Sequence, residues 1–315
     1  MPQLWENFHA VIAGHTAGSP VQEEVIWTHL STTAIGEQLA AYGTQVCASV
    51  VEQLLDAEGY HRRKAQKVVP LGQSQDRDAQ FRNIERLVQE YLDRGDPVLS
   101  MDTKKRELIG LFYRDGRLWV RRTLRVYDHD FPSSAEGVVI PHGLYDGRLN
   151  RGYVHLGTSH DTSAFACDCL GDWWRRFGSV QYPGAGSLLL LCDGGGSNSA
   201  NTYLFKADLQ GLVNGLGLEV RVAHYPPYCS KYNPIEHRLF CHLSRACRGA
   251  IFTGVGLVRE LMGAARTRTG LQVVVDIVDK MYETGRKVSE QVKAGLHPLR
   301  DAVLPKLNYR VLPQS

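Results

Sequence analysis

The sequence predicts an α/β protein, in which a mixed sheet is flanked by helices and is preceded by a helical region. Residues 188–192 form an apolar run that ends at Asp193 and is followed by glycine, which is typical of a strand buried on both faces of a sheet. Other short apolar strands alternate with amphipathic helices along the chain. With 43% hydrophobic and 22% charged residues, the composition is that of a globular protein with a sizeable core.

Charge, cysteine content and hydropathy narrow the classes of function. The net charge is only +3, so any affinity for nucleic acid has to come from local basic patches. The seven cysteines are scattered without regular spacing, which favours a reduced, cytoplasmic protein. No apolar run approaches the length of a membrane span, and the first residues lack the pattern of a signal peptide. We therefore expect no membrane partner.

The first 95 residues are expected to form a DNA-binding region and a connecting helix. Residues 1–20 are polar and are expected to be a poorly ordered lead-in. Two short amphipathic helices at about 33–58, joined by a turn that contains Gly43, fit a helix-turn-helix unit, although any two-helix hairpin has the same pattern. The connecting helix is expected over residues 76–94, where Gly95 ends it.

A basic run follows the second of these helices. It either binds DNA phosphates or is a solvated linker. The residues that we expect to contact DNA here are Arg62, Arg63, Lys64 and Lys67.

Residues 96–315 are expected to form a catalytic domain. The pattern predicts strands at 98–102, 117–126, 152–157, 187–192 and 218–224, and helices at 161–177, at 201–212 and from about residue 233. Proline at position 234 suits the first turn of that last helix. Two more helices and an end strand at 309–312 are expected after residue 250.

Three acidic residues stand at the ends of these elements. Asp102 and Asp193 each close a strand, and Glu236 lies in the first turn of a helix. Carboxylates that converged at one sheet end would repel each other unless cations lay among them, and such oxygen ligands suit Mg²⁺ or Mn²⁺. Two ions roughly 4 Å apart could clamp the attacking and leaving oxygens of a phosphodiester. Taken alone, Asp193 and the glycines after it also fit an ordinary turn.

Basic side chains lie close to these carboxylates in the sequence. Each would usually be a solvated charge, but here they are placed to steer phosphates: Lys104, Lys105, Lys231 and Arg238. A second cluster on the helix of Glu236 could suggest zinc, but it lacks a paired Cys-x-x-Cys and is weak evidence: His237, Cys241, His242 and Cys247.

The order strand-Asp, strand-Asp, helix-Glu resembles that of the DDE transposases and retroviral integrases, and the closer similarity is to the Rhodopirellula-type DDE transposases of bacterial insertion sequences. The two best-matching motifs are Asp-Gly-Gly-Gly-Ser-Asn at 193–198 and Ser-Lys-Tyr-Asn-Pro-Ile-Glu-His-Arg-Leu-Phe at 230–240. Further matching stretches are residues 98–107, 129–132 and 141–146. The resemblance runs from about Trp27 to Leu312. Members of this family usually have a further N-terminal helical region, and we expect this chain to begin after it.

The resemblance implies a ribonuclease-H-like fold, with Asp102, Asp193 and Glu236 as the catalytic and metal-binding residues and two Mg²⁺ or Mn²⁺ ions as cofactors. The implied function is cleavage of DNA at the ends of an insertion sequence and joining of the 3′ hydroxyl to target DNA. The implied partners are the terminal repeats, target DNA and further copies of the chain in a dimer or larger oligomer at the bacterial nucleoid. Two alternatives stay open at this point: a non-catalytic repressor that binds the terminal repeats, and a ribonuclease-H-like nuclease without strand transfer.

Overall fold

The computed structural model describes residues 2–18, 26–63, 76–195, 202–227 and 229–314. The chain divides into two compact units, residues 1–69 and 70–315. The expected boundary after residue 95 falls inside the larger unit, because the helix α4 (Arg77–Arg94) packs its Leu87 and Tyr91 against the central strands. In the part of the chain that the structure describes, no helix is long and apolar enough to cross a membrane.

In its described residues, the smaller unit consists of three helices and two short antiparallel strands. Its elements are α1 (Pro2–Ala13), β1 (Thr16–Gly18), β2 (Ile26–Thr28), α2 (Thr32–Ala41) and α3 (Ala48–Ala57). The side chain of Ser31 caps α2 by accepting a hydrogen bond from the Ala34 amide at 3.1 Å. The two expected helices are therefore present, but the expectation of a poorly ordered lead-in is wrong, because α1 buries Phe8 against Ile35 and Leu39.

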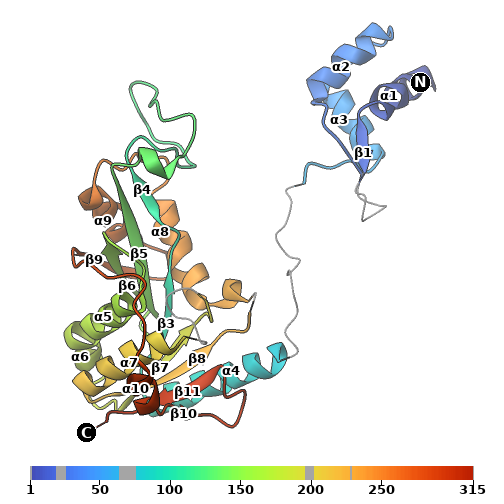
Figure 1. Ribbon diagram of the computed structural model, residues 1–315. Coiled ribbons are helices and arrows are strands. Elements are labelled where there is room, and N and C mark those ends of the chain that lie inside the picture. Colours follow the sequence, from blue (N-terminus) through green and yellow to red (C-terminus); the bar gives the residue numbers. More distant parts are fainter. Residues whose placement is uncertain (1, 19–25, 64–75, 196–201, 228, 315) are drawn as a thin grey trace. The chain divides into compact units, whose positions relative to one another are not determined.

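The larger unit contains one mixed sheet of nine strands in its described residues, in the order β10-β11-β8-β7-β3-β5-β6-β9, with β4 paired to β5 (Figure 1). The strands are β3 (Val98–Thr103), β4 (Glu107–Ile109), β5 (Gly137–Asp146), β6 (Arg151–Gly157), β7 (Ser187–Cys192), β8 (Glu219–His224), β9 (Gln272–Val278), β10 (Leu299–Arg300) and β11 (Asn308–Val311).

The directions of the central strands define the topology. Strands β3, β5 and β6 form an antiparallel meander, while β7 and β8 run parallel to β3 on its other side. This arrangement is that of the ribonuclease-H-like fold, so the predicted fold class is confirmed. Strands β9 and β11 then extend the sheet at both edges.

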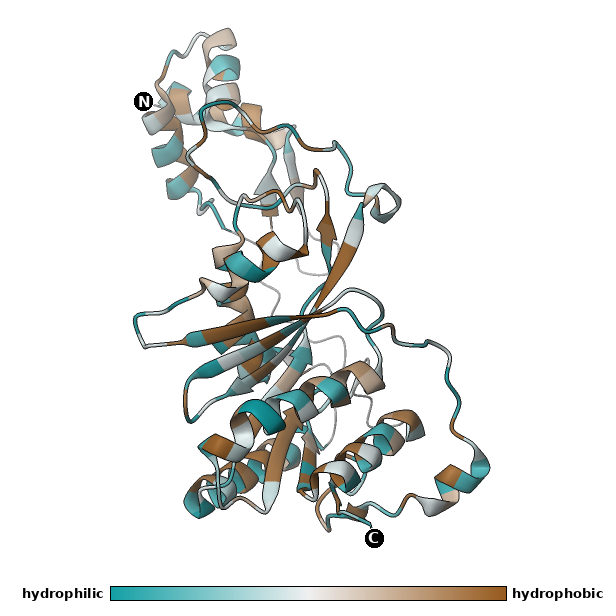
Figure 2. Ribbon diagram, turned by 90° about the vertical axis from the view of Figure 1, so that its left-hand side faces the viewer, coloured by the Kyte–Doolittle hydropathy of each residue, from teal (hydrophilic) through white to brown (hydrophobic). Residues whose placement is uncertain are grey.

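Helices cover both faces of the sheet. The remaining helical segments are η1 (Pro132–Ser134), α5 (Ser163–Trp173), η2 (Trp174–Gly178), α6 (Ser179–Gln181), α7 (Tyr203–Leu216), η4 (Ser230–Tyr232), η5 (Glu236–Phe240), α8 (Cys241–Ala246), α9 (Val255–Gly263) and α10 (Glu290–Gly295). Helices α5 and α7 bury Trp173, Phe205 and Leu209 against one face, whereas α4, η5, α8 and α9 pack on the other. In Figure 2 the hydrophobic residues run along the strands between these helices.

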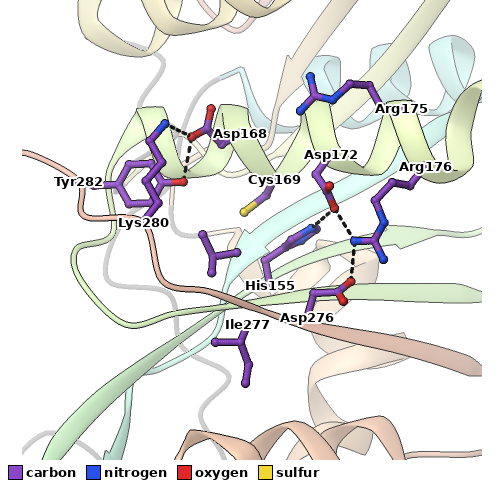
Figure 3. Close-up of a pocket in the computed structure, with 11 residues that line it drawn as sticks. His155, Asp168, Cys169, Asp172, Arg175, Arg176, Asp276, Ile277, Lys280 and Tyr282 are labelled. Atoms are coloured by element: carbon purple, nitrogen blue, oxygen red, sulfur yellow. Dashed lines mark hydrogen bonds and ion pairs between the residues drawn. The ribbon is translucent and has the colours of Figure 1, made fainter.

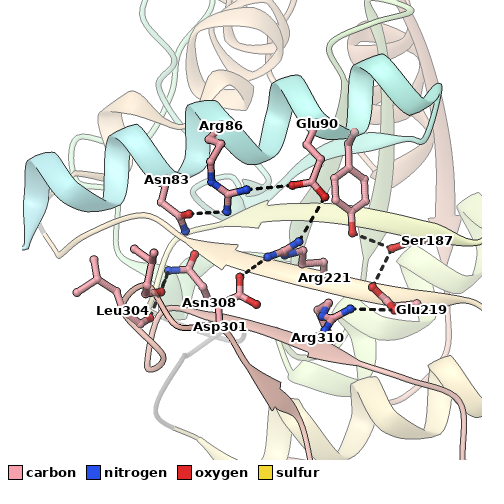
Figure 4. Close-up of polar contacts among 12 residues, drawn as sticks. Asn83, Arg86, Glu90, Ser187, Glu219, Arg221, Asp301, Leu304, Asn308 and Arg310 are labelled. Carbon is pink, nitrogen blue, oxygen red and sulfur yellow. Dashed lines mark hydrogen bonds and ion pairs between the residues drawn. The ribbon is translucent and has the colours of Figure 1, made fainter.

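Polar contacts fix α4 to the edge of the sheet (Figure 4). Arg221 of β8 lies between Glu90 of α4, at 3.8 Å, and Asp301, at 2.6 Å. The buried amides of Gln80 and Asn308 donate to each other's oxygens at 2.9 and 2.7 Å. Because a buried amide without a partner is destabilising, this reciprocal pair fixes the register of α4 against β11.

The expected strands differ from the observed strands at several places. Residues 117–126 are an exposed loop rather than a strand, because their apolar side chains find no sheet to pack on. Strand β5 was not predicted, since Gly137, Pro141 and Gly143 interrupt its apolar pattern. Strand β9 was not predicted either, although its residues alternate in burial as a strand should.

Candidate active site

Asp102 and Asp193 lie at the carboxyl ends of neighbouring parallel strands. Met101 of β3 is in register with Cys192 of β7, so the two aspartates occupy the next matched positions. Side chains at matched positions of adjacent strands point to the same face. The apolar run that ends at Asp193 buries both faces of β7, and the chain turns as soon as the carboxylate is reached. The sheet thus presents two carboxylates side by side, where its central strands end.

Backbone amides orient both carboxylates. The Thr103 amide donates to Asp102 Oδ1 at 2.7 Å, and the Gly195 amide donates to Asp193 Oδ1 at 3.3 Å. Each contact is made within two residues of the aspartate, so the local turn itself holds the side chain. The structure describes this turn as far as Gly195, and the rest of the glycine-serine-asparagine motif, from residue 196, lies outside the described residues.

Glu236 begins a π-helical turn, η5, that lies on the meander of the sheet. Asn233, which is fully buried, donates from Nδ2 to the carbonyl oxygen of Met101 at 3.3 Å. This bond ties the start of the helical segment to the residue that precedes Asp102. The Asn-Pro-Ile-Glu sequence at 233–236 therefore carries both the anchor and the carboxylate.

The three carboxylates affect each other's pKa values through electrostatic repulsion. Burial, followed by the negative charge of Asp193, raises the pKa of Asp102 to about 7, and Glu236 adds to this effect. Burial also raises the pKa values of Asp193 and of Glu236. The side chains of all three predicted residues are thus brought within electrostatic range at one sheet end.

Carboxylate oxygens are hard donors that suit a divalent cation. Burial and mutual repulsion disfavour the charged forms of these three carboxylates, and a bound cation would relieve the repulsion between them. As the side chains stand, no group of three or more His, Cys, Asp or Glu residues among those the structure describes is arranged to hold a metal ion. The donor set thus fits a divalent ion in its chemistry and its electrostatics, whereas the present positions of the described side chains do not form a coordination site.

Sequence reasoning missed a neighbouring polar chain that consists of His142, Thr103 and Asp161. Burial lowers the pKa of His142 to about 3, so its ring is neutral. The Thr103 hydroxyl donates its proton to Asp161 Oδ1 at 3.2 Å. The same hydroxyl lies 2.9 Å from His142 Nδ1, and because its only proton is already used, His142 Nδ1 is the donor to Thr103. Asp161 in turn raises the pKa values of Asp102 and Asp193 by its charge. No sequence signal pointed to this contact, because it depends on the pairing of Thr103 with His142 across β3 and β5.

The basic residues predicted to contact DNA have different surroundings. Lys104 is nearly buried and forms an ion pair with Glu107, whereas Lys105 is exposed. Lys231 and Arg238 are exposed on the segment that carries Glu236, and the Lys231 ammonium lies 5.2 Å from the Tyr232 ring.

In the smaller unit, Arg63 is exposed, and so is Arg62, which pairs with Glu52 at 3.1 Å. Lys64 and Lys67 lie outside the described residues.

A cavity of about 480 Å³ lies elsewhere, between α5 and the strands β6 and β9 (Figure 3). Most of its charged groups are paired among themselves. Arg176 bridges Asp172 and Asp276 at 2.8 Å each, and Lys280 pairs with Asp168 at 2.6 Å. His155 Nε2 also donates to Asp172 Oδ2 at 3.0 Å. These charge pairs therefore serve as links between α5 and the sheet.

Comparison with known proteins identifies the family of the chain. Residues 7–313 match the family described as the Rhodopirellula transposase DDE domain. Among solved structures, the chain is similar to the Mos1 transposase paired-end complex with the left transposon end, with 15% identity, 81% of this chain and 68% of that chain covered, and a TM-score of 0.45. It is also similar to the Mos1 strand transfer complex, with 14% identity, the same coverage and a TM-score of 0.44. Comparison with curated proteins gives no match. Because the family match spans nearly the whole chain, the protein belongs to the Rhodopirellula transposase DDE domain family and is a DDE-type transposase.

Proposed function

We propose that Asp102, Asp193 and Glu236 form the catalytic centre of this transposase and that they bind two Mg²⁺ or Mn²⁺ ions. The observation that carries the proposal is the matched position of Asp102 and Asp193 at the ends of β3 and β7, with Glu236 anchored beside them through Asn233. The reaction is cleavage of DNA at the ends of the element, followed by joining of the freed 3′ hydroxyl to target DNA.

Each residue has a distinct task in this proposal. Asp102 and Asp193 are held by the amides of Thr103 and Gly195, so both carboxylates are oriented before an ion or DNA arrives. Asp193 would hold the ions together with Asp102, and Glu236, from η5, would complete the ligand set. The ions, when bound, would activate the attacking oxygen and stabilise the leaving oxygen.

DNA is the substrate implied by the family, and the exposed basic residues beside the site support it. Lys105, Lys231 and Arg238 are exposed close in sequence to Asp102 and Glu236, where they can neutralise phosphates. We propose that the helix pair α2–α3, with the basic residues that follow it, binds the terminal repeats. Further copies of the chain assemble on DNA as a dimer or a larger oligomer.

The test is Asp193→Asn, which keeps the size of the side chain but removes one negative charge from the ligand set. The substrate is DNA that carries the inverted repeats flanking the gene, with Mg²⁺ or Mn²⁺ present. Strand cleavage should fall by at least about a hundredfold, because the ions supply several kcal/mol of transition-state stabilisation. Binding of the same DNA should be unchanged. A wild-type protein that binds these ends but never cuts them with either ion would overturn the proposal and would favour a repressor.

A further inference from the structure

The connection between β4 and η1 exposes apolar side chains that would ordinarily be buried. Trp119 is 105% exposed, and Leu118 and Leu124 are about half exposed, at 51% and 47%. A tryptophan with no protein contact surface is unusual in a folded chain, because its ring is among the largest apolar surfaces that folding can bury. Exposed apolar clusters of this kind mark interaction sites.

The same loop is strongly basic. Between Gly116 and Tyr127 the sequence contains four arginines and neither aspartate nor glutamate. All of them are exposed: Arg117, Arg121, Arg122 and Arg125. In a chain whose net charge is only +3, this loop concentrates positive charge on a few neighbouring residues, as phosphate-binding surfaces do.

Hydrogen bonding and close packing hold the two ends of the loop in place. The Tyr127 amide donates to the Leu111 carbonyl at 2.8 Å, and the Tyr127 ring packs edge-on against Phe112 at 5.5 Å between centroids. Gly116 has a φ of +134° and touches the 248–249 turn so closely that a Cβ atom would lie 2.6 Å from Arg248 Cβ. The loop therefore projects from a fixed base, as the green excursion beyond β4 in Figure 1 shows.

The loop begins after β4, which continues the edge of β5 along which β3, the strand of Asp102, is also paired. Strands β3 and β4 both pair antiparallel with β5, where Asp102 faces Gly143 and Ile109 faces Gly137. At about 3.3 Å per residue along β5, the base of the loop lies about 20 Å beyond Asp102. This distance corresponds to about six base pairs of a duplex, at about 3.4 Å each.

We propose that residues 117–126 form a second DNA contact of the catalytic unit, in which the arginines neutralise phosphates and the Trp119 indole stacks on a base exposed by an unpaired or kinked step. The proposal takes DNA as the partner from the proposed function and adds a site and a mode of recognition. Arginine beside an exposed aromatic ring is the combination that holds single-stranded or distorted nucleic acid. A second copy of the chain is the less favoured occupant, because it is itself net positive.

The test measures DNA binding by the full chain in EDTA, so that no cleavage occurs. One probe is a duplex and the other is the same duplex with a short unpaired stretch. Trp119→Ala should weaken binding of the second probe by at least about fivefold, while Trp119→Phe should keep most of the affinity because stacking is retained. Arg121→Ala with Arg122→Ala should weaken binding of both probes and lower the salt slope for the duplex by about 1.8, since each phosphate contact contributes about 0.9.

Two matched controls are Val180→Ala, which shortens an apolar side chain that is 75% exposed on α6, and Arg300→Ala, which removes an exposed arginine on the edge strand β10. Neither should change affinity for either probe.

Equal affinity of the wild type and Trp119→Ala for both probes would overturn the inference. So would a change in self-association of Trp119→Ala in sedimentation without any change in DNA affinity, which would assign the loop to a second copy. Failure of the wild type to cleave DNA with metal refutes only the proposed function, because the binding measurements need no catalysis.

Discussion

Gly143 of β5 lies directly against Phe240 of η5: a Cβ atom on Gly143 would stand 2.6 Å from Phe240 Cε1. Gly143 is also the register partner of Asp102. The absent side chain thus lets the segment that carries Glu236 rest on the strand pair that carries Asp102. Gly152 of β6 repeats the arrangement, since a Cβ atom there would lie 2.4 Å from Leu239 Cδ1.

Gly143→Ala should therefore separate Glu236 from Asp102. The added methyl group would push η5 outward, and overpacking of this kind costs about 1–3 kcal/mol of stability. We expect a lower melting temperature and a loss of DNA cleavage. Gly147→Ala is the control, because the nearest atom to its Cβ would lie at an ordinary 3.8 Å. If Gly143→Ala cleaved DNA at the wild-type rate, close packing of this helical segment would not matter for catalysis.

Asp102→Asn should stabilise the metal-free protein at neutral and alkaline pH. The folded protein binds the Asp102 proton more tightly than the unfolded chain, since its pKa is raised from 3.8 to about 7. The stability that this group contributes is complete below pH 4 and is lost as the pH rises through 7. The variant does not ionise, so its advantage should be absent near pH 4 and should grow to an upper limit of about 4 kcal/mol above pH 7.

Chemical denaturation in EDTA across this pH range measures the effect. Asp128→Asn, which changes an exposed carboxylate, is the control. An advantage of Asp102→Asn that was equal at pH 4 and pH 8 would contradict the assigned cause.

Thr103→Val should weaken the polar chain between His142 and Asp161. Valine has nearly the same shape but leaves His142 Nδ1 and Asp161 without the hydroxyl that joins them. A buried group that loses its partner costs about 1–3 kcal/mol. Thr103→Ser keeps the hydroxyl and should restore most of the stability lost in thermal melts. Equal melting temperatures for the valine and serine variants would show that the hydroxyl contributes nothing.

Replacing Arg62, Arg63 and Lys64 by alanine should weaken DNA binding for every sequence and reduce its salt dependence. Each phosphate contact contributes about 0.9 to the slope of log affinity against log salt. The Arg62–Glu52 ion pair is highly exposed, so its loss should change the melting temperature little. Titrations at several salt concentrations measure the slope, and an unchanged slope would mean that these residues are a solvated linker.

The sequence could predict the positions of the candidate site residues where these depend on local patterns. The apolar run of β7 placed Asp193 at a strand end, and the Asn-Pro-Ile-Glu motif placed Glu236 in a first helical turn. It could not predict β5, because Gly143 is explained by its close packing against Phe240 and Ile235, which come much later in the chain. The contact of Thr103 with Asp161 was missed for the same reason.

Local composition also misled where no tertiary contact supports it. Residues 117–126 are rich in apolar side chains typical of a strand, yet nothing in the described residues pairs with them as a sheet. The helix α1 was overlooked because its polar residues conceal the apolar stripe of Phe8, Val11 and Ile12.

The central pair of parallel strands, β3 and β7, has a consequence for the folding of the protein. The two strands are separated in the sequence by β5, β6 and α5, so their pairing is a non-local contact that closes a long loop. Asp102 and Asp193 become neighbours only when this pairing has formed. The proposed catalytic pair is therefore assembled by folding itself and is absent from any state of the chain in which β3 and β7 are apart.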